Sequence, residues 1–134
     1  MAQKLFEFLI VNSMTKLLAT KYGTLSRFDM TLKLFETRDM QLIKDHWHDD
    51  YMHLSDTQLD TRDNFEEFLK GLWDKGWSLL DPKSKPEVIH EDEDVLVVRH
   101  WWTDPDGTKW RMTNCSFWRD NKCWREMVNE VKVD

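Results

Sequence analysis

Residues 94–133 read DVLVVRHWWTDPDGTKWRMTNCSFWRDNKCWREMVNEVKV, and this stretch decides the fold. It is dense in Val, Trp, Phe, Met and Thr, which suit a pleated, half-buried surface. Turn-forming residues interrupt it at Asp104–Gly107 and at Asp120–Asn121. The pattern therefore predicts a large antiparallel sheet with strands over Pro86–Glu91, Asp94–Thr103, Thr108–Arg119 and Lys122–Val133.

The lengths of the turns predict which side chains share a face of this sheet. A turn over Asp104–Gly107 places Thr103 opposite Thr108, and a two-residue loop at Asp120–Asn121 places Cys115 opposite Glu126. Alternation then predicts two faces. One carries Val97, Arg99, Trp101, Trp110, Met112, Asn114, Ser116, Trp118, Arg125 and Met127. The other carries Leu96, Val98, His100, Trp102, Arg111, Thr113, Cys115, Phe117, Trp124, Glu126 and Val128. A bulge or a three-residue turn would reverse part of this assignment.

The composition bounds the class of protein. The 134 residues suffice for one domain with a core of its own. The net charge of −6 argues against a nucleic-acid-binding surface. No apolar run reaches the ~20 residues of a membrane span, and Glu7 interrupts the apolar start, so we expect no signal peptide. Cys115 and Cys123 fall on opposite faces in this register, so we expect free thiols and a cytoplasmic location.

The first 75 residues read mainly as helices. Apolar spacing predicts a helix over Leu5–Tyr22, although Phe6–Val11 could equally be a strand. Ser26 and Asp29 form a capping pattern before a second helix over Arg27–Thr37, and a short third helix starts at Asp39. A short strand at about Asp50–Ser55 follows, and then a helix over Arg62–Lys75 that Asp60 and Thr61 cap.

The chain is densest in chemical groups between His46 and His53, where three His and two Asp occur within eight residues. The spacing does not favour a metal site, because His46 and His48 straddle the corner between a helix and a strand. We expect no metal and no cofactor.

The order of elements, together with Phe35–Met40, Trp47–Tyr51, Glu91–Val97 and Phe117–Lys122, resembles the nuclear-transport-factor-2-like superfamily. Its SnoaL-like and ketosteroid-isomerase-like branches are nearest. The resemblance covers about Ser26 to Val133. It implies an α+β fold in which a curved antiparallel sheet wraps over the N-terminal helices, a cystatin-like α+β cone roll. We expect one domain over residues 1–134, in which residues 1–25 are a helical extension.

The same resemblance predicts that the family's usual catalytic groups are missing. The ketosteroid-isomerase-like base position falls on Ser55, the Tyr position on Thr31 and the acid position on Cys115. The base position of the SnoaL-like cyclases falls near Val128. None of these four side chains can perform the corresponding step.

Other groups could act in a pocket at the mouth of the cone. His53, His100 and Glu126 are the candidate acids and bases, because His and carboxyl groups can exchange protons near neutral pH. Glu126 could instead be neutralised by Arg111 on the same predicted face. The candidate ligand-binding residues are Tyr51, Ser55, Trp102, Thr113, Cys115, Phe117, Trp124 and Val128.

Three functions follow as alternatives. The first is a domain that binds a small apolar ligand without the usual family acids. The second is a lyase or isomerase that acts on a small hydrophobic ketone or alcohol by His/Glu acid–base catalysis. The third is a dimeric assembly domain, because large apolar residues on the other face predict a homodimer interface through Trp101, Trp110, Met112, Trp118 and Met127. We expect neither a nucleic-acid nor a membrane partner.

Overall fold

The computed structural model describes residues 15–56 and 58–133. Two helices begin where capping residues satisfy their first backbone N–H groups. Helix α2 (Arg27–Thr37) begins after Ser26, whose Oγ accepts from the Asp29 N–H at 3.0 Å. Helix α4 (Arg62–Asp74) begins after Thr61, which caps Asn64. Helix α3 (Gln41–His46) lies between them, and a 3₁₀ turn, η1 (Pro82–Ser84), follows.

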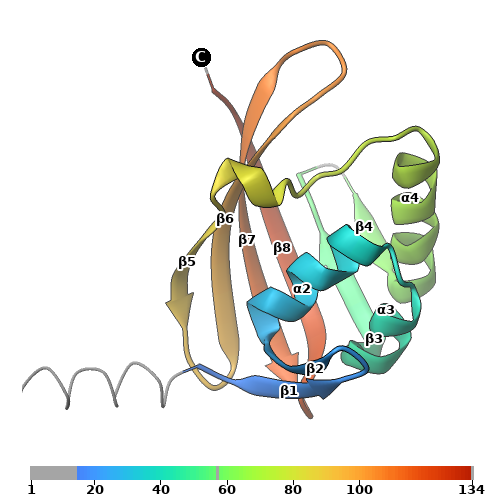
Figure 1. Ribbon diagram of the computed structural model, residues 1–134, viewed down its shortest axis with the longest axis vertical. Helices are drawn as coiled ribbons and strands as arrows, with labels where there is room; N and C mark the ends of the chain where they lie inside the picture. Colours follow the sequence, from blue (N-terminus) through green and yellow to red (C-terminus); the bar gives the residue numbers. More distant parts are fainter. Residues whose placement is uncertain (1–14, 57, 134) are drawn as a thin grey trace, which may run out of the picture.

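The six-stranded sheet has the order β4-β3-β8-β7-β6-β5. Only β3 and β8 run parallel among these neighbours, and the other pairs are antiparallel. The strands are β3 (Trp47–Leu54), β4 (Leu59–Thr61), β5 (Glu87–Glu91), β6 (Val95–Thr103), β7 (Lys109–Arg119) and β8 (Lys122–Val133). The sheet curves around the helices, which all lie on its concave side (Figure 1). This arrangement confirms the α+β cone predicted from the sequence, with one parallel strand pair.

The core fills the space between α2, α3, α4 and the concave face. Met30, Leu34, Leu42, Ile43 and Leu69 are fully buried there. They pack with Trp47, Tyr51, Leu96, Val98, Trp118 and Cys123 from the sheet in one cluster. No helix in the described ranges is long and apolar enough to cross a membrane.

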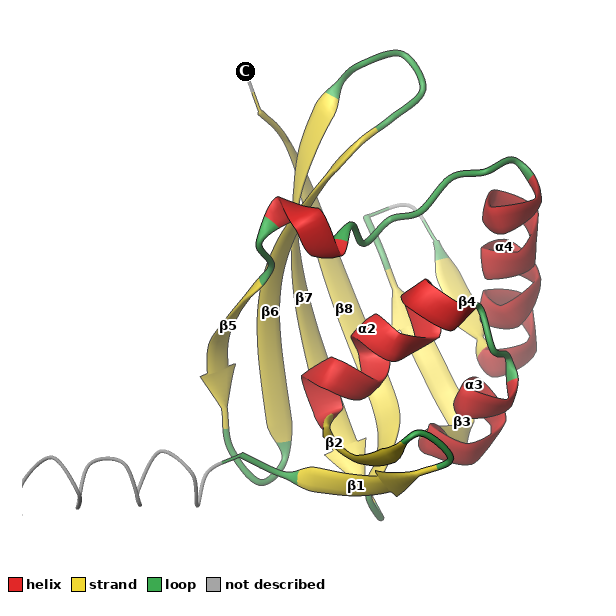
Figure 2. Cartoon of the chain, in the orientation of Figure 1, coloured by secondary structure: helices red, strands yellow, loops and turns green. Residues whose placement is uncertain are grey.

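The helix predicted over Leu5–Tyr22 is wrong in its last part, because strands β1 (Leu17–Thr20) and β2 (Gly23–Ser26) form a hairpin there. Gly23 adopts a φ of 101°, which Gly tolerates without strain, and Thr20 Oγ1 donates to the Gly23 carbonyl at 2.7 Å. The hairpin lies across one end of the cone (Figure 2). Residues 5–14 of the predicted helix lie outside the described residues.

The predicted pairing of β7 is also wrong by one residue, along its whole length with β6 and beyond a bulge with β8. The loop between β6 and β7 turns over three residues, with Gly107 at a φ of 85°, so Thr103 pairs with Lys109 and Trp102 with Trp110. Asp120 and Asn121 do form the predicted two-residue loop, and Arg119 pairs with Lys122. A bulge then shifts the register, so Cys115 faces Met127 instead of Glu126. The concave face of β7 therefore carries Trp110, Met112, Asn114, Ser116 and Trp118.

Candidate functional site

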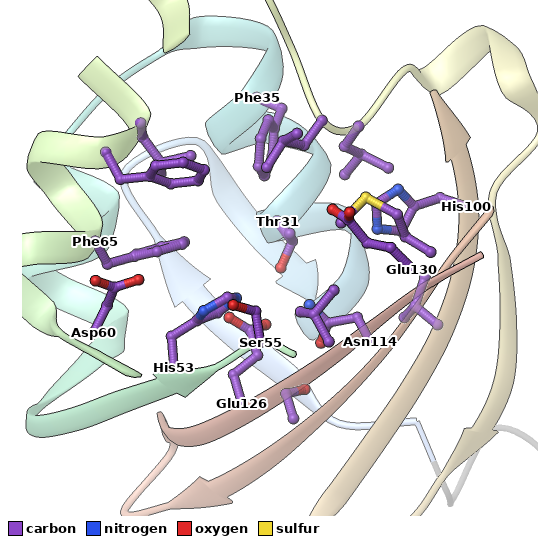
Figure 3. A pocket seen from close by; sticks show the side chains of 18 of the residues that line it. Thr31, Phe35, His53, Ser55, Asp60, Phe65, His100, Asn114, Glu126 and Glu130 are labelled. Atoms are coloured by element: carbon purple, nitrogen blue, oxygen red, sulfur yellow. The ribbon is translucent and has the colours of Figure 1, made fainter. Parts of the chain in front are cut away.

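A cavity of about 150 Å³ lies between the concave face of the sheet and helices α2 and α4 (Figure 3). The helices contribute an apolar wall, and the sheet contributes most of the polar groups. The apolar wall includes Phe28, Phe35, Phe65, Phe68 and Leu69, and Leu79 and Leu80 close one end. Gln58, Phe68 and Glu130 are the most exposed lining residues, and they mark the mouth.

His53 lies between two acidic residues in the sheet. On β3 it pairs with Asp60 of β4 on one side and with Glu126 of β8 on the other. Direct cross-strand neighbours point to the same face with Cβ atoms about 5 Å apart. All three side chains line the cavity, so a base and two carboxyl groups converge at this end (Figure 3).

Glu126 is held by a buried hydrogen bond. The Tyr51 hydroxyl donates to Glu126 Oε1 at 2.5 Å. Burial, and then the neighbouring Glu126 charge, raise the pKa of Tyr51 well above its usual value of 10.0. Tyr51 therefore stays protonated and acts as a permanent donor to Glu126. This bond corrects the predicted pairing of Glu126 with Arg111, which lies on the convex face.

The ring of His53 stacks on Phe65, with 5.4 Å between the ring centroids and 21° between their planes. Its Nδ1 is buried and has no hydrogen-bond partner among the residues that the structure describes. A buried nitrogen without a partner is costly, so it calls for a partner that the cavity receives from outside. The stacking fixes the ring, and the free nitrogen makes it a group that can accept a proton.

The other end of the cavity holds His100 of β6. His100 pairs with Met112 of β7, and Met112 pairs with Glu130 of β8, so these three residues form one row across the sheet. Burial lowers the pKa of His100 to about 4, against a hydrogen bond to the Leu79 backbone that raises it. Burial also raises the pKa of Glu130 at the cavity mouth, and the nearby Asp56 adds to this shift. His100 is therefore a neutral imidazole at pH 7.

The candidate residues from the sequence fall into three groups. His53, Ser55, His100, Glu126 and Val128 line the cavity, and Tyr51 lies behind Glu126. Trp102 lines a neighbouring groove together with Trp101 and Lys109. The corrected register places Thr113, Cys115 and Phe117 on the convex face, and Phe117 and Trp124 line an apolar hollow there.

The predicted dimer face also changes with the register. Trp101 and Met127 lie on the convex face, whereas Trp110, Met112 and Trp118 lie on the concave face. Met112 lines the cavity and Trp118 belongs to the core, with exposed fractions of only 4% and 6%.

Several polar lining residues were not predicted as site residues from the sequence, among them Asn114, Glu130 and Asp60. Side chains alternate between the two faces along β7 and β8, so the registers of the hairpins place Asn114 and Glu130 on the concave face. Asp60 reads as a helix cap, but its Oδ1 accepts from the Gln58 side chain at 2.8 Å beside the cavity. In the described ranges, no group of three His, Cys, Asp or Glu could hold a metal ion.

The curved sheet, the helices on its concave side and the enclosed pocket together define a cone-shaped domain of the nuclear-transport-factor-2-like superfamily. The sequence pattern of the SnoaL-like domain matches residues 29–122, and the chain belongs to this family. No curated protein is detectably similar to it in sequence.

The solved structures that are similar to the chain include the following three. An NTF2-like protein of unknown function from Cytophaga hutchinsonii is 9% identical, with 78% of this chain and 95% of that chain covered and a TM-score of 0.55. A putative SnoaL-like polyketide cyclase from Mesorhizobium loti is 11% identical, with 75% and 92% covered and a TM-score of 0.51. A loop-truncation variant of IdmH is 16% identical, with 76% and 90% covered and a TM-score of 0.50. At these identities the likeness concerns the fold alone.

Proposed function

We propose that this protein is an acid–base enzyme of the lyase or isomerase type that acts on a small, largely apolar ketone or alcohol. The observation that carries the proposal is the convergence of His53 and Glu126, which are direct cross-strand neighbours, in one apolar cavity. A cavity of about 150 Å³ is comparable with the engineered apolar cavity of about that size that binds benzene. A single ring therefore fits inside the cavity, which opens at the mouth marked by Gln58, Phe68 and Glu130.

The reaction begins when His53 takes a proton from the carbon next to the carbonyl. The electron pair of the C–H bond moves into the carbon skeleton, and the carbonyl oxygen becomes an enolate. Asn114 lines the same cavity and supplies an amide N–H for that oxygen. His53 then returns the proton, to the same carbon or to one conjugated with it. The Glu126 charge stabilises the imidazolium between the two steps.

Proton exchange into a model ketone tests this proposal without knowledge of the substrate. The protein is incubated with 2-indanone in D₂O, and loss of the α-proton signal is followed by ¹H NMR. We expect exchange faster than in buffer, because a positioned base contributes about 10²–10⁴-fold. His53→Gln and Glu126→Gln should each slow it at least about tenfold. His90→Gln, at an exposed histidine that pairs with Asp92 on the surface, should leave the rate unchanged.

A binding-only function uses the same cavity without proton transfer. A ligand that binds only the folded state raises the melting temperature by mass action. If 2-indanone raises the melting temperature but its proton exchange is no faster than in buffer, the enzyme proposal is wrong. The protein is then a binding domain. The presence of carboxyl groups on the cavity wall favours the enzyme. Asp60, Glu126 and Glu130 all line it, although the usual family positions hold other residues.

We also propose that the convex face of the sheet pairs with a second copy of the chain. Leu54, Leu59 and Met127 are 45%, 57% and 51% exposed. Together with Met52, Phe117 and Trp124 they line an almost entirely apolar hollow on this face. A contiguous apolar surface of this kind is typical of a subunit interface.

A further inference from the structure

The cavity has polar groups at two ends, and the proposed proton transfer uses only one of them. Along β8, Glu126 at one end and Glu130 at the other are four residues apart, which corresponds to about 13 Å. Val98, Asn114 and Val128 form the row between the ends, so only one amide interrupts the apolar wall there. Figure 3 shows His53, Ser55 and Glu126 apart from His100 and Glu130, with Asn114 between the two sets.

His100 is the group at the far end that calls for a partner. Its side chain is buried, at 7% exposure, and it lines the cavity. Its Nδ1 has no hydrogen-bond partner within the described part of the chain. Buried polar atoms are nearly always hydrogen-bonded, so an orphan nitrogen at a cavity wall indicates a ligand atom or a bound water.

The chemistry of a neutral imidazole limits the kinds of chemical group that can bind to His100. Each tautomer has one nitrogen that donates and one that accepts. Since burial keeps His100 uncharged at pH 7, an anionic group gains no ion pair there. The hydrogen bond to the Leu79 backbone uses the ring N–H of the neutral imidazole, so Nδ1 is left as an acceptor, and a hydroxyl group can donate to it.

We infer that His100 is a second recognition position, which binds a hydroxyl group at the end of the ligand remote from His53 and Glu126. This inference rests on the proposed function and narrows its substrate class. The ligand is a flat, largely apolar molecule with two oxygen functions at opposite ends. One oxygen lies at the His53 end and the second is a hydroxyl. Glu130, at the mouth in the same row as His100, adds an acceptor on the side where ligand enters.

Three naphthalene probes of nearly equal size test the inference in the wild-type protein. These are 2-naphthol, 2,6-dihydroxynaphthalene and 6-methoxy-2-naphthol, and isothermal titration calorimetry gives their affinities. We expect the diol to bind at least about tenfold more tightly than 2-naphthol, since 2-naphthol has only one hydroxyl and leaves the polar group at one end of the cavity without a partner. The methoxy compound has only one hydroxyl group, so it cannot donate at both ends of the cavity and should bind more weakly than the diol. Equal affinities for all three would overturn the inference and indicate a bound water at Nδ1.

His100→Phe is the matched variant, because it keeps an aromatic ring and removes both nitrogens. It should lose the preference for the diol and bind the diol no more tightly than it binds 2-naphthol. If His100→Phe does not fold, His100→Gln serves instead and should keep only part of the preference. An unchanged preference in a folded variant would contradict the inference.

The outcome is separable from that of the proposed enzyme. A diol preference without catalysed exchange into 2-indanone would leave the recognition position in place and remove the enzyme. Catalysed exchange without a diol preference would remove the recognition position alone.

Discussion

At the scale of single residues, the site depends on how Tyr51 holds Glu126. The tyrosine is 1% exposed, and its hydroxyl, the one polar group of the side chain, donates a hydrogen bond to the carboxylate. Burying a carboxylate is costly unless hydrogen bonds compensate for the lost water. Tyr51 therefore determines both where Glu126 lies and what its burial costs.

Removing that donor should destabilise the fold measurably. Tyr51→Phe keeps the ring and deletes the hydroxyl, and we expect a loss of about 1.5–3 kcal/mol, the value of a hydrogen bond to a charged group. Tyr22→Phe is the matched control, because the Tyr22 hydroxyl donates to Asp39 at 2.8 Å at an exposed site. Urea unfolding measures both. Equal losses in the two variants would contradict the role given to the buried bond.

His100 should make stability depend on pH in a defined window. Its pKa is 6.5 in the unfolded chain and about 4 in the folded one, so between these values only the unfolded chain binds the proton. The stabilisation is fully present above pH 6.5 and is lost as the pH falls towards 4. The shift corresponds to about 3 kcal/mol. The difference in unfolding free energy between wild type and His100→Gln should shrink by up to that amount from pH 7 to pH 4, and a constant difference would contradict it.

Most residues on β6 and β8 could be assigned to faces from the sequence, but Trp124 on β8 and the residues on β7 could not. Alternation alone correctly put His100, Glu126 and Val128 on the concave side. β7 is reversed because each hairpin that flanks it shifts by one residue, at the three-residue loop before Lys109 and at the bulge beside Trp124. Both shifts depend on local backbone geometry, which composition and periodicity do not specify.

At the scale of the elements, one buried arginine fastens α2 to the sheet. Arg27 is 2% exposed, and its two terminal nitrogens donate to the carbonyls of Asp92 and Glu93 at 3.0 and 2.6 Å. Its guanidinium also lies 4.9 Å from the ring centroid of Trp118. The turn between β5 and β6 is thereby tied to the start of the helix that covers the cavity.

Arg27→Lys should not preserve this connection, because an ammonium group is a point donor and cannot span two carbonyls as a planar guanidinium does. We expect a loss of about 2 kcal/mol from the missing bond and the buried charge. Arg99→Lys changes the same residue type at a partly exposed pair with Glu87 and should cost less than about 0.5 kcal/mol. Thermal or urea unfolding gives the loss of unfolding free energy in each variant. Comparable losses in the two variants would contradict the role of Arg27 in holding α2 to the sheet.

Helices with caps could be predicted closely, and the first hairpin could not. Ser26 and its acceptor bond to Asp29 mark the start of α2 at the expected residue. The apolar residues of Leu17–Tyr22 fit a helical period as well as a strand, and only pairing with Gly23–Ser26 decides between them. Strand pairing is a contact between segments, so local sequence does not reveal it.

At the scale of the whole molecule, the concave and convex faces of one sheet have different tasks. The concave face contains the cavity, and we propose that the convex face pairs two copies. The chain has a mass of 16.3 kDa, so size-exclusion chromatography with light scattering should give about twice that value. Met127→Lys should yield monomers, since it places a charge in the apolar hollow, whereas Gln41→Lys on α3 should not. A monomeric wild type would exclude the dimer.

The most direct test of the central claim asks which face of the sheet receives the ligand. Met112 and Val128 line the cavity, whereas Met127 and Val131 are exposed on the convex face of the same sheet. With Met and Val methyl groups labelled, isotope-filtered NOE spectra with 2-naphthol should show contacts from the ligand to Met112 and Val128. Contacts to Met127 and Val131 instead would place the ligand on the wrong face and contradict the account.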